Sequence, residues 1–219
     1  NNHIHSTGLY DRVCAGLTIC GNENVASHNV IHDVPRDGIF INGKLNTAEY
    51  NEIRNSMLYT ADNSAIALRQ HDVNQAVRNR GNVLRYNRIL DVVGYGSYPH
   101  CQHPGKGFAS PFCSFGIYLD GSICGVTVYG NIIARCGGTS VFVQFGGDNA
   151  VENNIFVEGD AKRVQFDSMV FFGTFMYSDR EGKYKEQEPP NRFRHNIFYY
   201  GGPDTKLYQV GHWDNAPTW

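Results

Sequence analysis

The stretch Asn29-Val-Ile-His-Asp-Val-Pro-Arg-Asp-Gly-Ile-Phe-Ile-Asn42 holds the two short patterns that decide the fold. One is asparagine, any residue, then isoleucine or phenylalanine; the other is a strand in which inward and outward residues alternate. Asparagine tolerates the left-handed conformation of a sharp turn, and its amide can bond to equivalent amides on neighbouring repeats as a ladder. The isoleucine two residues later then points inward. Because both patterns recur, the sequence indicates a repeat architecture.

The asparagine pattern occurs seven times, beginning at Asn2, Asn29, Asn51, Asn87, Asn131, Asn154 and Asn196. Successive copies are 27, 22, 36, 44, 23 and 42 residues apart. The short steps predict a unit of about 22 residues, which suits one coil of a β-solenoid, and the long steps predict inserted loops. We expect Asn29, Asn51, Asn87, Asn131 and Asn154 to stack at one corner.

The alternating strand recurs as Gly38-Ile-Phe-Ile-Asn42, Ala65-Ile-Ala-Leu-Arg69, Gly116-Ile-Tyr-Leu-Asp120 and Ser140-Val-Phe-Val-Gln144. Aligned as four rungs, these strands place two aliphatic columns inward: Ile39, Ile66, Ile117 and Val141, then Ile41, Leu68, Leu119 and Val143. The sequence therefore predicts an all-β fold, a right-handed parallel β-helix (a single-stranded solenoid). Residues 1–219 are expected to form one domain, part of a longer solenoid, with loop insertions at about 70–78, 95–114 and 159–191.

Composition and charge limit the classes of partner. The net charge is −2 and the sequence pI is about 6.5, so we expect neither a nucleic-acid nor a membrane partner. The N-terminal residues have neither the charge nor the apolar block of a signal peptide, and the oligomeric state stays open. We expect no cofactor.

The six cysteines contain no Cys-x-x-Cys pair, so no metal site is expected. Cys101 and Cys113 flank one insertion. They would be joined in an oxidising compartment, and in a reduced protein they would be free buried thiols.

Beside the inward columns, the same alignment places Phe40, Ala67, Tyr118 and Phe142 outward, next to a polar column of Asn42, Arg69, Asp120 and Gln144. Solvent-facing rings beside polar groups describe a sugar-binding groove, whereas rings under a loop would only cover the sheet. The insertions, which carry His71 and Asp72, are expected to wall a cleft over this face.

Several stretches resemble one family of parallel β-helix repeat proteins. They are the run from His32 to Gly43, Asp62-Asn-Ser-Ala-Ile66, Arg80-Gly-Asn-Val-Leu-Arg-Tyr-Asn87, Gly116-Ile-Tyr-Leu-Asp120, Val128-Tyr-Gly-Asn131 and Gly147-Asp-Asn-Ala-Val-Glu-Asn-Asn-Ile-Phe156. Together they span about residues 25 to 158 and resemble glycoside hydrolase family 141. The resemblance implies an extracellular or periplasmic enzyme that acts on plant-wall glycans, with fucosidase and xylanase activities in the family.

The family pattern places its acidic residues at Asp62 and Asp120. The chain departs from that pattern in three places: Gly121 replaces a second aspartate, Arg69-Gln-His-Asp72 replaces Gly-Arg-Asp-Trp, and Gln144-Phe-Gly-Gly-Asp-Asn149 replaces Gly-Gly-Gly-Arg-Asp-Asn.

Glycoside hydrolysis usually needs two carboxyl groups that flank the bond. Asp120 is the first candidate, and Asp62 and Asp72 compete for the second role, although each aspartate also fits a structural role in a turn. Arg69 beside Asp120 would keep that carboxylate ionised, which suits a nucleophile or base. The substrate-binding candidates are Asn42, Arg69, His71, Tyr118, Phe142 and Gln144.

Two other functions stay open. A polysaccharide lyase or uronate epimerase on the same fold would use Arg69 and His71 to neutralise a carboxylate and remove a proton. A glycan-binding or adhesin solenoid would have no catalytic residues. All three hypotheses share a polysaccharide or oligosaccharide partner and a secreted or periplasmic location.

Overall fold

The structure is a computed structural model that describes residues 1–8, 10–70, 79–96, 107–158, 168–174, 190–201 and 206–212. In these residues the chain forms strands and turns and no α-helix. Within the same ranges, no helix is long and apolar enough to cross a membrane. The fold is therefore all-β, as predicted.

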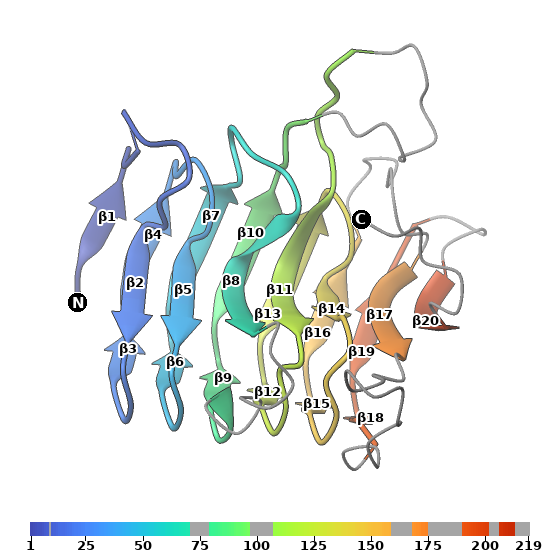
Figure 1. Ribbon diagram of the computed structural model, residues 1–219. Coiled ribbons are helices and arrows are strands. Elements are labelled where there is room, and N and C mark those ends of the chain that lie inside the picture. Colours follow the sequence, from blue (N-terminus) through green and yellow to red (C-terminus); the bar gives the residue numbers. More distant parts are fainter. Residues whose placement is uncertain are drawn as a thin grey trace, which may run out of the picture.

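The strands form three parallel sheets, which we call A, B and C (Figure 1). Sheet A contains β1 (His3–His5), β4 (Val30–His32), β7 (Glu52–Ser56), β10 (Arg88–Val92), β13 (Ile132–Cys136), β16 (Ile155–Val157) and β19 (Ile197–Tyr199). Sheet B contains β2 (Leu17–Cys20), β5 (Ile39–Asn42), β8 (Asn63–Gln70), β11 (Ser114–Gly121), β14 (Val141–Val143), β17 (Ser168–Thr174) and β20 (Lys206–His212). Sheet C contains β3 (Val25–Ser27), β6 (Thr47–Glu49), β9 (Val83–Arg85), β12 (Thr127–Tyr129), β15 (Ala150–Glu152) and β18 (Arg192–Arg194).

The chain visits sheets A, B and C in turn and then returns to sheet A, so each strand pairs with the strands three places before and after it. We call one such passage a circuit. Figure 1 shows the strands of sheet B side by side, from β2 near the N-terminus to β20.

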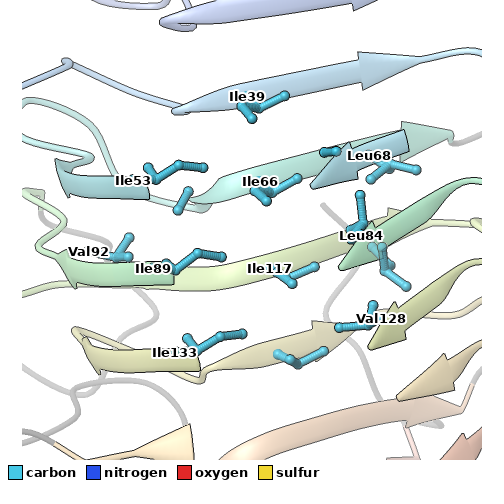
Figure 2. Close-up of a cluster of buried hydrophobic side chains, with 14 of the residues drawn as sticks. Ile39, Ile53, Ile66, Leu68, Leu84, Ile89, Val92, Ile117, Val128 and Ile133 are labelled. Atoms are coloured by element: carbon cyan, nitrogen blue, oxygen red, sulfur yellow. The ribbon is translucent and has the colours of Figure 1, made fainter. Parts of the chain in front are cut away.

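The core lies between the three sheets. The register confirms both inward columns, because Ile39, Ile66, Ile117 and Val141 are successive partners, as are Ile41, Leu68, Leu119 and Val143. All eight side chains are fully buried. Figure 2 shows Ile39, Ile66, Ile117 and Leu68 of these columns with inward residues of the other sheets, such as Ile53, Ile89 and Val128. Aliphatic side chains in register fill the interior as continuous stacks.

The seven predicted asparagines form one continuous hydrogen-bonded series, which we call the first ladder. In every step the backbone N–H and the side-chain amide of one asparagine donate to Oδ1 of the next; Asn87 donates to Asn131 at 2.9 and 3.0 Å. The series runs through Asn2, Asn29, Asn51, Asn87, Asn131, Asn154 and Asn196. The prediction that these side chains stack at one corner is confirmed.

The conformation expected of these asparagines was wrong. The left-handed residue is the one before the asparagine: His28, Tyr50, Tyr86, Gly130, Asn153 and His195 have φ between 53° and 66°. This residue turns the chain from sheet C into sheet A, and the asparagine links the circuits. A bulky side chain rarely adopts this conformation, so the tight turn is imposed by the stacked circuits on either side.

A second ladder joins the turns from sheet B into sheet C. It consists of Asn24, Asn46, Asn82, Asn149 and Asn191, each five residues before an asparagine of the first ladder. Asn24 and Asn46 donate through their backbone N–H to Oδ1 of Asn46 and Asn82, at 2.9 and 2.8 Å. In one circuit Val126 takes the asparagine position, and its N–H donates to Oδ1 of Asn149 at 3.0 Å.

The predicted insertions are only partly loops. The expected loop at 159–191 is wrong in its middle, because residues 168–174 form β17 and pair with β14 and β20. The reason is the apolar run Met169-Val-Phe-Phe172, in which Val170 and Phe172 continue the inward columns. Residues 71–78 and 97–106 lie outside the described residues. Cys101 is among them, so its pairing with the buried Cys113 stays a prediction.

The gap in the second ladder yields a prediction. In a Val126→Asn variant the new Oδ1 can accept the backbone N–H of Asn82, as the other asparagines do, so we expect the free energy of unfolding to change by less than about 1 kcal/mol or to rise. Val128→Asn is the matched control, because Val128 is fully buried in the core beyond both ladders. It should lose about 3 kcal/mol. Urea unfolding of both variants measures the difference, and equal losses would show that the ladder position does not accept an amide.

Candidate functional site

The predicted polar column lies at the ends of the strands of sheet B. Asp120 is the register partner of Arg69. Arg69 Nε lies 2.7 Å from Asp120 Oδ2, and this ion pair is the centre of the column. On one side Gln144 Oε1 accepts the backbone N–H of Gly121 at 2.8 Å, and on the other Asn42 ends β5 as an exposed side chain. The structure thus confirms Arg69 beside Asp120 and brings Gln144 into contact with the next residue, whereas the paired register between β5 and β8 ends at Ile41, one residue before Asn42.

The Arg69–Asp120 pair is largely shielded from solvent. The side chain of Asp120 is 10% exposed and that of Arg69 is 29% exposed. The Arg69 guanidinium also lies over the ring of Phe40, 5.8 Å from its centroid. A charged hydrogen bond in such partial burial is stronger than on an open surface, so the carboxylate is held in one orientation.

Tyr118 is the third member of this group. Burial raises the pKa of its hydroxyl well above the ordinary value, and the negative charges of Asp120 and then Asp62 act in the same direction. A hydrogen bond from the hydroxyl to Asp120 adds to the effect. Tyr118 therefore stays protonated at neutral pH and donates to a carboxylate that also accepts from Arg69.

Of the two interpretations of the outward rings, the structure favours the one in which the rings are covered and not the solvent-facing column. Tyr118 and Phe142 point away from the core as predicted, but each is only 3% exposed. They belong to an outer aromatic cluster, defined as Phe112, Cys113, Phe115, Tyr118, Phe142 and Phe171, with Ala61 and Ala109 packed against it. The rings of Tyr118 and Phe142 stack on each other at 4.8 Å.

Segment 109–115, which enters β11, contributes part of the outer aromatic cluster and covers sheet B. Ring faces that pack on other rings are not available to stack on a sugar.

The other predicted catalytic aspartates are not seen beside Asp120. Asp62 is exposed, lies just before β8, and donates its N–H to the carbonyl of Cys113 at 2.7 Å. Asp120 is near the other end of the paired strand β11, so the two aspartates belong to opposite ends of the pair. The negative charges of both aspartates raise the pKa of Tyr118. Asp72 and His71 lie outside the described residues.

Sequence reasoning missed a buried carboxyl at Asp37, the residue before Gly38 and β5. Its Oδ2 accepts from Asn63 Nδ2 at 3.0 Å and lies 3.6 Å from Arg36 Nε. Burial raises the pKa of Asp37 to about 6, although the charges of Arg36 and then Arg69 lower it. The signal was present in the aligned strands, because the other circuits carry Ser64, Phe115 and Thr139 at this position.

Arg69 thus interacts with two carboxyl groups in different environments. It pairs directly with Asp120, and its charge also acts on Asp37. Two carboxyl groups in different electrostatic environments can have different pKa values. Such pairs serve as the acid and the base of catalytic sites. No group of three or more histidine, cysteine or acidic side chains in the described ranges is arranged to hold a metal ion.

Comparison with known proteins adds no assignment. The chain matches no protein-family model, no curated protein and no solved structure.

The buried Asp37 yields a prediction about pH. An unfolded aspartate titrates near 3.9, so the folded state binds this proton more tightly. The resulting stabilisation is present below about pH 4 and is lost as pH rises through about 6, a change of about 3 kcal/mol. Asp37→Asn stays neutral and lacks this loss. We therefore expect the stability of the variant relative to the parent to increase between about pH 4 and pH 7. Chemical unfolding across this range measures it, and parallel pH profiles would contradict it.

Proposed function

We propose that the three sheets are the faces of a right-handed parallel β-helix. Every pairing between the named strands of the described residues is parallel, and each strand pairs with the strand that is three places along the chain. In both ladders an asparagine donates to the asparagine of the next circuit along the chain, which fits a chain that winds in one direction. Connections between parallel strands of one sheet are right-handed in about 98% of cases, and this supports the hand.

We also propose that the protein hydrolyses glycosidic bonds of an extracellular or plant-wall polysaccharide. The observation that carries this proposal is the carboxylate of Asp120, held between the guanidinium of Arg69 and the hydroxyl of Tyr118 at the end of a strand. A carboxylate that is held in place by two hydrogen-bond donors suits the nucleophile or base of a glycosidase. The resemblance of residues 25 to 158 to glycoside hydrolase family 141 points to the same class and to secretion or a periplasmic location.

The acid partner has two candidates. Asp62 interacts with the same tyrosine hydroxyl as Asp120, although it lies at the opposite end of the paired strands. Asp72 follows Arg69 by three residues in the sequence and lies outside the described residues. Two carboxyl groups about 5 Å apart would give retention of configuration, and about 6.5 to 9.5 Å would give inversion. Asn42 and Gln144 flank the pair and would contact sugar hydroxyl groups.

The two alternative functions have weaker support. A lyase or epimerase needs a cation to neutralise the substrate carboxylate, but Arg69 already pairs with Asp120. Its base, His71, lies outside the described residues. A glycan-binding solenoid without catalysis would use exposed ring faces, and Tyr118 and Phe142 are buried.

The test replaces one carboxylate and measures turnover. In Asp120→Asn the size is kept and the charge is lost, so we expect reducing-sugar release from plant-wall polysaccharides to fall at least about 1,000-fold.

Asp91→Asn is the matched control, because Asp91 pairs with Arg135 on the outer side of sheet A, at 2.5 Å between Oδ1 and Nε. It should leave the rate unchanged and affect stability by about 1 kcal/mol or less. A folded Asp120→Asn variant that cleaves at the parent rate would remove Asp120 from the mechanism.

A further inference from the structure

Three imidazole rings gather on the outer side of sheet A, away from the Arg69–Asp120 pair. His3 and His5 lie on the same side of β1, and His32 on β4 is the register partner of His5. Ring centroids are 4.8 Å apart for His3 and His32, 4.9 Å for His3 and His5, and 5.1 Å for His5 and His32. No residue of the proposed glycosidase site takes part, so this group needs its own explanation.

Two of the rings direct nitrogen atoms at each other. His3 Nε2 lies 2.6 Å from His32 Nε2, which is shorter than the usual range of hydrogen bonds between neutral groups. The third ring is arranged differently, because His5 is almost parallel to His32, with 6° between the planes. Its Nδ1 lies 3.2 Å from Ser6 Oγ. Of the three rings, His3 and His32 therefore direct their Nε2 atoms at the same point.

Asp33 fixes which nitrogen of His32 is available. His32 Nδ1 lies 2.7 Å from Asp33 Oδ2, and Asn55 Nδ2 donates to the other carboxylate oxygen at 3.0 Å. When Nδ1–H donates to a carboxylate, Nε2 carries the lone pair and faces His3. A carboxylate behind a histidine is the usual second partner of histidines that bind metal ions.

We propose that His3 and His32 bind a divalent transition-metal ion through Nε2 of each ring, with Asp33 as a positioning residue. Two zinc ligands at about 2.05 Å in tetrahedral geometry lie about 3.3 Å apart, so the nitrogens need to separate by about 0.7 Å. His3 is exposed and can supply this movement by side-chain rotation. Water completes the coordination on the open side.

The donor set also selects the class of ion. Imidazole nitrogen suits zinc, copper and nickel, whereas magnesium and calcium prefer oxygen ligands. Among the described residues, Asp33 is the carboxylate in contact with these rings, and it is occupied by His32 and Asn55. We therefore expect zinc to bind and magnesium to leave the protein unchanged.

The experiment is a calorimetric titration of the full chain, without an affinity tag, with zinc chloride at about pH 7.5, because protons compete with metal ions for their ligands. We expect one zinc ion per chain. His3→Gln and His32→Gln should each weaken binding by more than tenfold, and Asp33→Asn by about tenfold.

His195→Asn is the matched control. His195 is an exposed histidine with φ of 57° on a distant turn, and asparagine tolerates this backbone. It should leave zinc affinity unchanged. Circular dichroism of each variant verifies that the fold is retained. Absence of saturable zinc binding, or equal binding by the His3→Gln/His32→Gln double variant, would overturn the proposal.

Discussion

The hydrogen bond from one asparagine to the next is the interaction on which the rest of the structure depends. In the first ladder, Oδ1 of each asparagine accepts two donors from the preceding circuit, and its amide donates onward; Asn131 Nδ2 also donates to the carbonyl of Leu84 at 2.9 Å. These groups are buried, so each would cost free energy if left without a partner. The ladder therefore fixes the rotation of every circuit relative to its neighbours. Because side chains alternate along a strand, a slip of one residue would turn the aliphatic columns outward.

The chemistry of sheet B follows from this register. Arg69 lies opposite Asp120 because Ile66 and Leu68 lie opposite Ile117 and Leu119, so one alignment sets both the core and the ion pair. Segment 109–115, which enters β11, packs over the sheet in the outer aromatic cluster, and this leaves Tyr118 able to donate but not to stack on a ligand. The histidines of sheet A follow from the same stacking, since β1 and β4 pair through His5 and His32.

Sequence alone was sufficient for features that recur in every circuit and insufficient for those that occur once. The asparagine pattern predicted the first ladder, and the aligned strands predicted the column from Asn42 to Gln144. The second ladder was equally readable from Asn24 and Asn46, each five residues before an asparagine of the first, but its gap at Val126 obscured the series. Burial of Tyr118 and Asp37 depends on segments that pack over them, and periodicity does not report such contacts. β17 was missed because the long step from Asn154 to Asn196 was interpreted as a repeat with an inserted loop at 159–191, although the apolar run Met169-Val-Phe-Phe172 lies within it.

Equilibrium unfolding of Asn131→Ala tests most directly whether the ladder holds the circuits together. The substitution removes an acceptor for the N–H and the amide of Asn87 and a donor to Asn154. We expect a loss of about 3 kcal/mol, against less than about 0.5 kcal/mol for Asn42→Ala, an exposed asparagine outside both ladders. A loss for Asn131→Ala that is no larger than for Asn42→Ala would contradict the account.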